Sequence, residues 1–339
     1  MVVERVREAV REGGLFARDR VAGRPILVML SGGRDSTCLL DVAVALRGAA
    51  GVSALHVDYR LRESSDADQR HCAQLCEELG VELHRVRAEP SAAPSAPAPP
   101  STREADRASA SGNLHAWARE LRYREAHRIA RERDSVIAAG HTASDQLETI
   151  LYRLAASPGR RALLGMPARE GRLIRPLLGL TREHTGAYCR ERGLSWCEDQ
   201  SNDDQRFARA RVRNALVPAL LAVHPAAFEN VLRTAALLRE ETELLDGLVD
   251  AELAGRRSVA VARLRELPAA LARMLVVRLA EDATGAHVPQ AGDRVHEILA
   301  LASRSSSGRG GRAELHLGAH AAAVIERGQL SMIKLPPRA

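Results

Sequence analysis

The stretch "LVMLSGGRDSTCLLDVAVAL" (residues 27–46) has an apolar run, a paired-glycine turn and an amphipathic segment, which predict a buried strand followed by a helix. At the carboxyl end of a parallel strand, such a helix points free backbone N–H groups and its positive dipole end at the turn, where anions bind. Gly32 and Gly33 let the backbone approach an anion, and the hydroxyls of Ser31 and Ser36 can donate to phosphate oxygens. Since neither common phosphate-loop motif is present, a plain turn with an aspartate cap stays the alternative.

A second group of polar residues surrounds the start of a helix predicted at about 144–155. Asp145 and Glu148 are three residues apart and therefore share one helix face, where two carboxylates can hold an ammonium group or a metal ion. The alternative is that they are solvated partners of the helix dipole. His141 precedes this helix and could contact phosphate or transfer a proton, or be an ordinary loop histidine.

Arginines cluster in two further stretches that the pattern predicts as helical or helix-flanking. The first, "ARELRY", contains Arg119 and Arg122, and the second, "RFARARVRNAL", contains Arg209, Arg211 and Arg213. Clustered guanidinium groups match phosphate geometry. A solvated basic face, or one that forms salt bridges with the acidic "EDQSNDD" before the second stretch, is the competing interpretation.

Composition favours a polyanionic partner such as nucleic acid. The 339-residue chain has 49 Lys and Arg against 43 Asp and Glu, which gives a net charge of +6, and Lys334 is its only lysine. No apolar run approaches the roughly 18 residues that span a bilayer, so we expect a soluble, cytoplasmic protein with no membrane partner. The five cysteines are odd in number and form no C-x-x-C pair, which predicts reduced, buried thiols.

Apolar runs alternate with amphipathic ones along the first half of the chain. This rhythm predicts an α/β fold with a Rossmann-like, doubly wound parallel sheet. We predict strands at 25–30, 52–57, 81–86 and 135–139, and helices at about 36–48, 64–79, 115–133 and 144–155.

The chain divides into three predicted parts. Residues 1–215 form the sheet domain, in which the Pro/Ala/Ser-rich stretch 88–113 is expected to be a disordered insertion. Residues 216–302 have helical patterning throughout and predict an α-helical domain. Residues 303–339 begin with a Ser/Gly/Arg-rich linker and continue as short apolar segments around glycines, which predicts a small β cap.

Several segments resemble one family when read together. The loop from Ser31 to Ser36, S-G-G-R-D-S, resembles the pyrophosphate loop of the N-type ATP pyrophosphatases. "LHVDYRLRE", "GNLHAWARELRY", "AAGHTASDQLETILYRL", "LIRPLLGLTREHTGAYCRERGLSWCEDQSND" and "RFARARVRNALVPAL" then follow in the order of the tRNA(Ile)-lysidine synthetases. The resemblance covers residues 31–220, and the ordered set is far more specific than the loop alone.

The resemblance implies a two-step reaction. ATP would adenylate the C2 oxygen of the wobble cytidine in an isoleucine tRNA with a CAU anticodon, and free L-lysine would displace AMP to give lysidine. It implies ATP and Mg²⁺ as cofactors, a ligand role for Asp35 toward Mg²⁺, tRNA docking by the helical domain, and a homodimer.

The resemblance also implies roles for individual residues. The expected ATP-binding residues are Ser31, Gly32, Gly33, Arg34, Asp35 and Ser36, the expected catalytic residues are Asp35, Asp58, His141, Asp145 and Glu148, and the expected tRNA-binding residues are Arg119, Arg122, Arg175, Arg209, Arg211 and Arg213.

Some positions depart from the family pattern. Tyr59 and Arg60 stand where His-Gly is usual, His115 replaces a glutamate, Ser144 replaces an acid, and Ala210 replaces an asparagine. Two alternative functions remain open: a tRNA thiolase of the same superfamily, which would need a cysteine pair or an iron–sulfur cluster, and a noncatalytic RNA-binding module.

Overall fold

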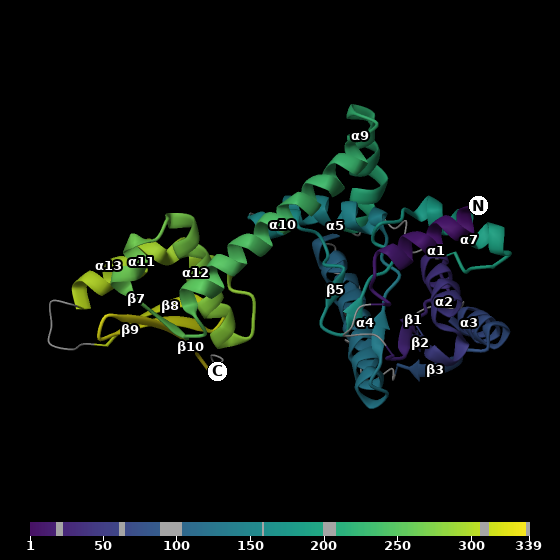
Figure 1. The fold of residues 1–339 in the computed structure, drawn as a ribbon, viewed down its shortest axis with the longest axis horizontal. Helices are drawn as coiled ribbons and strands as arrows, with labels where there is room; N and C mark the ends of the chain where they lie inside the picture. Colours follow the sequence, from purple (N-terminus) through teal and green to yellow (C-terminus); the bar gives the residue numbers. More distant parts are fainter. Residues whose placement is uncertain are drawn as a thin grey trace. The chain divides into compact units, whose positions relative to one another are not determined.

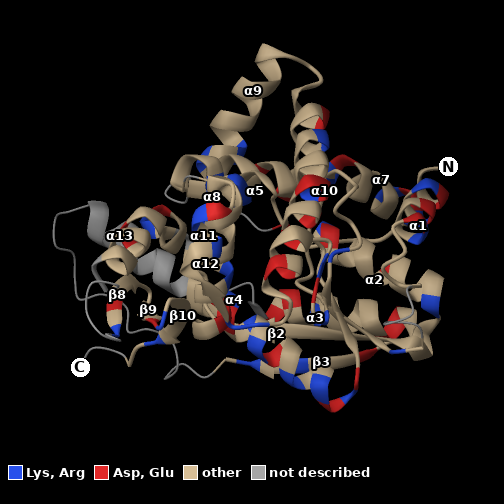
Figure 2. Cartoon of the chain, turned by 60° about the vertical axis from the view of Figure 1, so that its left-hand side comes forward, with Lys and Arg blue, Asp and Glu red and all other residues tan. Residues whose placement is uncertain are grey.

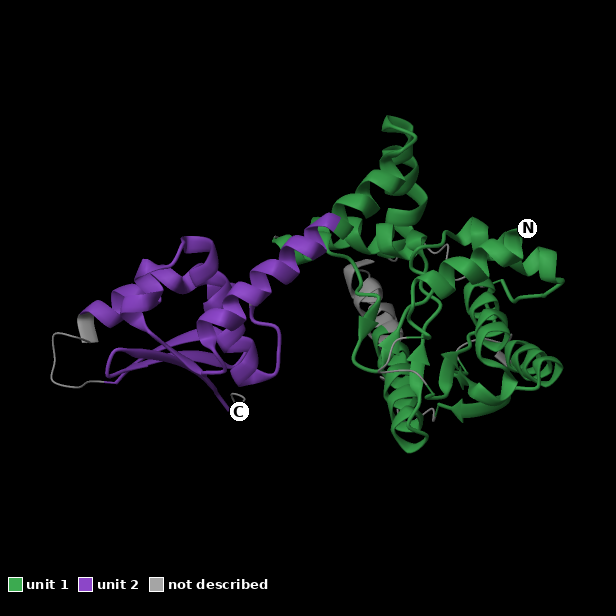
Figure 3. Ribbon diagram, viewed as in Figure 1, with its two compact units in different colours: residues 1–236 green, residues 237–339 purple. Residues whose placement is uncertain are grey.

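The computed structural model describes residues 1–17, 23–60, 65–88, 104–157, 159–198, 208–305 and 312–336. Contacts divide the chain into two compact units, Met1–Ala236 and Leu237–Ala339 (Figure 3).

A six-stranded sheet forms the centre of the first unit (Figure 1). Its strand order is β3-β2-β1-β4-β6-β5, and every pair is parallel except β5 with β6. The chain therefore winds to one side of β1 through β2 and β3, and to the other side through β4 and β6. The strands are β1 (Ile26–Met29), β2 (Val52–Asp58), β3 (Glu82–Arg87), β4 (Val136–Ala138), β5 (Arg169–Glu170) and β6 (Leu173–Ile174).

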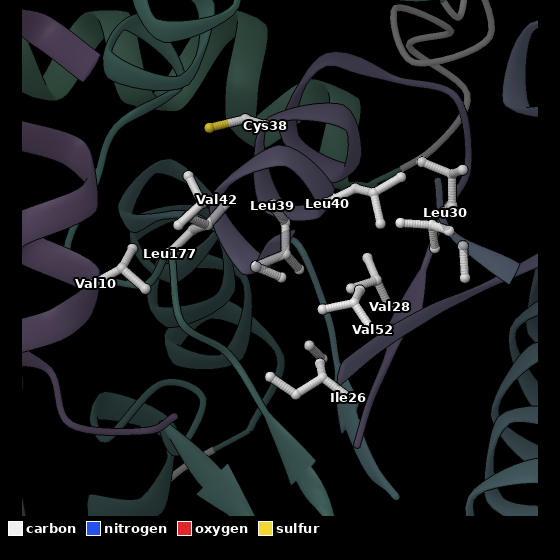
Figure 4. Packing of buried hydrophobic residues seen from close by; sticks show 14 of the residues in the cluster. Val10, Ile26, Val28, Leu30, Cys38, Leu39, Leu40, Val42, Val52 and Leu177 are labelled. Atoms are coloured by element: carbon white, nitrogen blue, oxygen red, sulfur yellow. The ribbon is translucent and has the colours of Figure 1, made fainter. Parts of the chain in front are cut away.

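Helices cover both faces of this sheet. Because successive strand residues point to opposite faces, Val28 of β1 packs toward α1, α2 and α7, whereas Leu27 packs toward α4. In Figure 4, Leu39 and Leu40 of α2 lie over Val28 and Val52. The helices of this unit are α1 (Val2–Glu12), α2 (Arg34–Arg47), α3 (Ser65–Leu79), α4 (Glu104–Glu132), α5 (Ala143–Ala156), α6 (Arg160–Leu163), α7 (Arg182–Arg192), α8 (Ala208–Arg211), a π-helical turn (Val212–Leu216), α9 (Val217–Val223) and the start of α10 (Ala227–Leu253).

This architecture confirms the predicted doubly wound α/β fold, and the four predicted strands and helices are all present. One helix begins well before its predicted start. Helix α4 begins at Glu104, inside the stretch 88–113 that the sequence predicted to be a disordered insertion, because Ala, Glu and Arg favour helix there and no proline follows position 100 within that stretch. Residues 89–103 lie outside the described residues.

The second unit has one core of its own. An antiparallel sheet of order β7-β10-β9-β8 packs with helices, and Leu275 of α12 and Ile298 of α13 share a cluster with Ile325 of β9. The predicted β cap and much of the predicted helical domain therefore form a single body. Its elements after α10 are β7 (Ser258–Ala260), α11 (Val261–Glu266), α12 (Ala269–Thr284), α13 (Val295–Ser305), β8 (Ala313–Gly318), β9 (Ala321–Glu326) and β10 (Gln329–Lys334).

No single helix among the described residues is long and apolar enough to cross a membrane. One pair of helical segments, Ala208–Val223 and Ala227–Leu253, passes that test together by length and composition, with a bend of 97° between them.

Candidate active site

The predicted site residues gather where neighbouring strands of the first unit end. Ser31 follows β1 and His141 follows β4, and these two parallel strands are hydrogen-bonded neighbours. Asp58 ends β2 and Arg175 follows β6 at the same edge of the sheet. Because the chain winds in opposite directions on the two sides of β1, this edge is a topological switch point, the usual place for a ligand in an open α/β sheet.

Hydroxyl groups shape the loop after β1. The Ser36 hydroxyl accepts from the backbone N–H of Ser31 at 3.2 Å and donates to the Gly33 carbonyl at 2.9 Å, and the Ser31 and Ser36 hydroxyls are 3.1 Å apart. Gly32 has a φ of +85°, a conformation that favours glycine. The N-cap of α2 is Gly33, so Asp35 is not the cap but lies in the first turn of the helix.

The loop is packed directly against the segment that follows β4. A Cβ atom added at Gly140 would lie 3.1 Å from the backbone of Asp35 and Ser36. Glycine at position 140 therefore allows the start of α2 and the turn before α5 to approach each other closely.

Asp35 receives contacts from α7 and from its own loop. The Thr185 hydroxyl of α7 donates to Asp35 Oδ1, and Arg34 Nε lies 3.3 Å from the same oxygen. Burial raises the pKa of Asp35, and the hydrogen bond from Thr185 and the charge of Arg34 oppose that rise. The carboxyl group thus sits where a bound cation would stabilise its charged form.

Asp145 has a structural contact on one oxygen and a charged partner on the other. Its Oδ2 accepts from the Thr142 backbone N–H at 2.8 Å and from the Thr142 hydroxyl at 2.9 Å. The first of these bonds, together with the Asp145 backbone N–H that donates to the Thr142 hydroxyl oxygen at 3.4 Å, forms the capping box of α5. Asp145 Oδ1 accepts from Arg182 Nη2 at 2.6 Å. Although burial works to raise the pKa of Asp145, Arg182 and Thr142 hold it below its ordinary value.

Glu148 lies one turn further along α5 and is only 3% exposed. Arg182 Nη1 donates to its Oε1 at 2.8 Å, and Arg213 donates from Nε to Oε1 at 2.8 Å and from Nη2 to Oε2 at 3.1 Å. A buried carboxylate needs such partners to remain charged. Asp145 and Glu148 therefore share one helix face, as predicted, and both bind the same guanidinium group.

Arg182 is the central residue that the sequence did not single out. It is the first residue of α7, after the N-cap Thr181, and its Nε also lies 3.9 Å from Asp35 Oδ2. Its carboxylate partners on α5 are 34 and 37 positions away in sequence, so no local pattern connects them. The only sequence signal was its place in "LTRE", within the segments that resemble the family.

His141 is neutral near pH 7. Burial lowers its pKa to about 4, and the nearby charges of Arg175, Arg119 and Arg122 act in the same direction, whereas Asp145 opposes them. Its Nδ1 atom is buried and has no hydrogen-bond partner among the residues that the structure describes. A neutral imidazole with an unpartnered buried nitrogen can accept or donate a proton.

Asp58 shapes the turn after β2. Its Oδ1 accepts from the backbone N–H of Arg60 at 2.9 Å, and Arg60 has a φ of 52°. Arg87 Nε lies 3.6 Å from Oδ2, which is buried and accepts no hydrogen bond from the described part of the chain.

The predicted tRNA-binding arginines differ in how their side chains are held. Arg119 and Arg122 of α4 lie over the Tyr123 ring, at 4.8 Å and 5.8 Å from its centroid. Burial lowers the pKa of Arg119, and the nearby charges of Arg122, Arg209 and Arg175 act in the same direction. Arg175 itself is only 4% exposed.

The remaining contacts show how the arginines are held. Arg175 donates to the Pro167 carbonyl at 2.7 Å and to Glu170 at 3.1 Å, which fixes it within the fold. Arg209 donates to Thr149 of α5 at 3.1 Å, and Arg211 is exposed (basic residues are blue in Figure 2). Of the predicted alternative partners, the acidic residues at 198–204, the structure describes Glu198, which is exposed, and the others lie outside the described residues.

Positions that depart from the family pattern have defined contacts where the structure describes them. The Tyr59 ring packs edge-on to Trp117 with 6.3 Å between centroids, and the Ser144 hydroxyl accepts from the backbone N–H of Arg182 at 3.3 Å. Ala210 is buried in α8. The side chain of His115 lies outside the described residues.

Two thiols border the loop after β1. A Cβ atom added at Gly32 would lie 3.2 Å from Cys72 Sγ and 3.6 Å from Cys197 Sγ. All five cysteines are free, as predicted, and four are buried. Burial raises the pKa of Cys197 to about 11 and that of Cys72 still further, so both thiols are protonated at neutral pH. The described residues contain no group of three or more His, Cys, Asp or Glu that could hold a metal ion.

Comparisons with known proteins identify the family that residues 5–220 match. Residues 5–220 match the family model of the PP-loop domain. A tRNA(Ile)-lysidine synthase of Pseudomonas fluorescens is 38% identical over 235 residues, which are 67% of this chain and 48% of that protein. A tRNA(Ile)-lysidine synthase of Gloeobacter violaceus is 36% identical over 236 residues, which are 67% of each chain. The chain thus spans about half the length of several curated relatives that it matches.

A solved structure supports the fold. The U34-tRNA thiolase NcsA from Methanococcus maripaludis, with its [4Fe-4S] cluster, superimposes with a TM-score of 0.55 at 15% identity, over 70% of this chain and 79% of that one. At this identity the likeness concerns the fold alone.

Proposed function

The chain belongs to the PP-loop family and, within it, to the tRNA(Ile)-lysidine synthases, and from this premise we propose that it is an ATP-dependent ligase that makes lysidine. In the first step, the C2 oxygen of the wobble cytidine of an isoleucine tRNA with a CAU anticodon attacks the α-phosphorus of ATP, and pyrophosphate leaves. In the second step, an amine of free L-lysine attacks C2, loses a proton, and AMP leaves with the original oxygen.

One observation carries this proposal. Asp145 and Glu148 lie together beside the loop that contains Asp35, and all three carboxylates face a single cationic group. Such an arrangement can hold the ammonium form of an amine substrate next to a phosphate-binding loop, and the amine becomes the nucleophile toward the adenylate once it has lost a proton.

The loop supplies the phosphate contacts. The start of α2 and the hydroxyls of Ser31 and Ser36 are placed to bind the triphosphate and to stabilise charge on departing pyrophosphate. Asp35 fits a Mg²⁺ ion, because Mg²⁺ prefers oxygen ligands and is usually held by one or two carboxylates with phosphate oxygens. When bound, the ion would supply charge neutralisation at the phosphates.

Two residues near the loop have proposed roles in proton transfer and in shaping the site. His141 is neutral at the working pH and lies near Asp145, so it is our candidate to take the proton that the amine loses. Asp58 is placed to fix the turn that follows β2, through its hydrogen bond to Arg60.

We propose that tRNA phosphates bind at Arg119, Arg122, Arg209 and Arg211. Arg175 and Arg213, whose side chains are held by hydrogen bonds within the fold, would add positive charge to this site. The cluster of guanidinium groups on α4 and α8 supports this. The second unit is our candidate for additional tRNA docking. A cytoplasmic location and a homodimer are expectations from the family.

Sulfur transfer is disfavoured by the state of the thiols. Cys72 and Cys197 lie beside the loop, but burial keeps both protonated, whereas the nucleophile in such chemistry is a thiolate. A noncatalytic RNA-binding module, in turn, does not need three carboxyl groups gathered beside a phosphate-binding loop.

Labelled amino acids test the proposal. The full chain is incubated with ATP, Mg²⁺, the CAU-anticodon isoleucine tRNA and each labelled amino acid in turn. We expect lysine alone to enter the tRNA, in a bond that survives the mild alkali that removes aminoacyl esters. Incorporation of sulfur from a sulfur donor, or binding without ATP consumption, would contradict the proposal. The same tRNA with uridine at the wobble position is the control and should accept nothing.

A further inference from the structure

Arg182 blocks the carboxylate oxygens that an incoming ammonium group would use. Asp145 Oδ1 and Glu148 Oε1 both accept from this guanidinium, at 2.6 Å and 2.8 Å. The other oxygen of Asp145 is already bonded twice by Thr142, and the other oxygen of Glu148 is bonded by Arg213. An ammonium that contacts both carboxylates must therefore compete with Arg182 for the same two oxygens.

A third carboxylate, that of Asp35, also attracts the guanidinium of Arg182. Arg182 Nε lies 3.9 Å from Asp35 Oδ2, and Asp35 is in the first turn of the helix that follows the phosphate-binding loop. Phosphate oxygens at that loop carry more negative charge than a single carboxylate, and guanidinium groups pair with phosphate strongly. Bound triphosphate would therefore draw Arg182 away from α5.

We infer that Arg182 is a gating residue that occupies the lysine site until ATP binds. The guanidinium then moves toward the phosphates and frees Asp145 Oδ1, and the position that it occupied on Glu148 Oε1 beside Arg213, for the substrate ammonium. This inference rests on the proposed function, since it takes lysine as the amine that binds there. It implies that ATP and lysine bind with positive coupling, and that Arg182 carries this coupling.

The neighbouring contacts make the exchange local. Arg182 stands at the first position of α7, where Thr181 caps the helix and Thr185 donates to Asp35. Arg213 makes two hydrogen bonds to Glu148, so this buried carboxylate keeps a charged partner after Arg182 leaves. The gate can therefore open without leaving Glu148 uncompensated.

Calorimetric titration of L-lysine into the full chain tests this inference, with and without a nonhydrolysable ATP analogue and Mg²⁺. We compare the wild type with Arg182→Met, and with Arg182→Gln as a second variant should the first fold poorly. Without nucleotide, the variants should bind lysine about tenfold more tightly than the wild type, because the competing charge-assisted hydrogen bonds are gone. The analogue should tighten lysine binding in the wild type and change it much less in the variants.

Arg192→Met is the matched control. Arg192 is on the same helix and also makes two hydrogen bonds to a buried carboxylate, Asp41, which lies in a separate cluster. This variant should lose thermal stability and retain wild-type lysine binding and coupling.

Two outcomes separate the inference from the proposed function. If the wild type incorporates lysine into tRNA but folded Arg182 variants bind lysine no more tightly than it does, or keep its full coupling to nucleotide, the gating role is wrong and the function stands. If the wild type neither binds nor incorporates lysine, the proposed function fails and the gating role falls with it.

Discussion

Substituting alanine for Gly140 tests whether the phosphate-binding loop depends on the turn after β4. The added Cβ would lie 3.1 Å from the Asp35 carbonyl carbon, the Asp35 oxygen and the Ser36 nitrogen. Carbon atoms in good contact are about 3.5–4.0 Å apart, so the start of α2 must move by a few tenths of an ångström. These neighbours are backbone atoms in the first turn of a buried helix, so they cannot move aside as a flexible side chain would.

Gly140→Ala should lower stability through overpacking and lower the reaction rate through misplacement of Asp35 and Ser36. Overpacking typically costs about 1–3 kcal/mol, so the free energy of unfolding should fall by that amount. A misplacement of about 1 Å can cost about a hundredfold in rate, so a smaller shift of Asp35 and Ser36 should lower kcat about tenfold. Tm and tRNA-dependent pyrophosphate release measure the two effects.

Gly179→Ala is the matched control, because among the described residues, its two chain neighbours apart, no heavy atom lies within 4 Å of a Cβ at that position. We expect wild-type rates and stability from it. A Gly140→Ala protein with wild-type kcat and KM for ATP would refute the claim that close packing of these two segments positions the loop.

Three further outcomes are expected. Asp35→Asn should lower the rate of pyrophosphate release by a factor of a hundred or more, since one preorganised charged group is worth about 3 kcal/mol at a transition state. The variant should retain the wild-type Tm, because burial raises the pKa of Asp35 and makes a charge there costly in the folded state. The pKa of His141 is about 4 in the folded state against 6.5 in the unfolded chain, so the unfolded chain binds more protons between these values and stability is lost as pH falls through them. After discounting for the partial exposure of this side chain, we expect denaturant titration to show that the free energy of unfolding falls by about 1–2 kcal/mol between pH 7 and pH 5. This loss should be absent in His141→Asn. Arg119→Glu should reduce the salt-dependence slope of tRNA binding by about one unit, whereas Arg131→Glu on the same helix should leave it unchanged, and equal slopes would remove Arg119 from the interface.

Local patterns were enough to predict much of the fold. Period and composition located β1, α2 and their neighbours, because buried parallel strands read as continuous apolar runs. The short strands β5 and β6 were not predicted, since two residues each carry no periodic signal. Helix α4 starts earlier than expected because alanine and serine fit either a linker or a helix, and composition alone does not separate them.

The site shows a similar division. Spacing placed Asp145 and Glu148 on one face, and the paired glycines located the loop, because these relations lie within a few residues of sequence. The part played by Arg182 depends on a contact between α7 and α5, which only the tertiary structure brings together. Sequence spacing also gave no sign that Arg175 is buried by contacts with Pro167 and Glu170.

Mass spectrometry of nucleosides from the reacted tRNA tests the central claim most directly. The full chain is incubated with ATP, Mg²⁺, L-lysine and the CAU-anticodon isoleucine tRNA, and the tRNA is then digested completely. We predict that one cytidine per tRNA gains the mass of lysine less one water, only when ATP and lysine are both present, and that it maps to the wobble position. A tRNA with unchanged cytidine, or with a base that has exchanged oxygen for sulfur, would contradict the assignment.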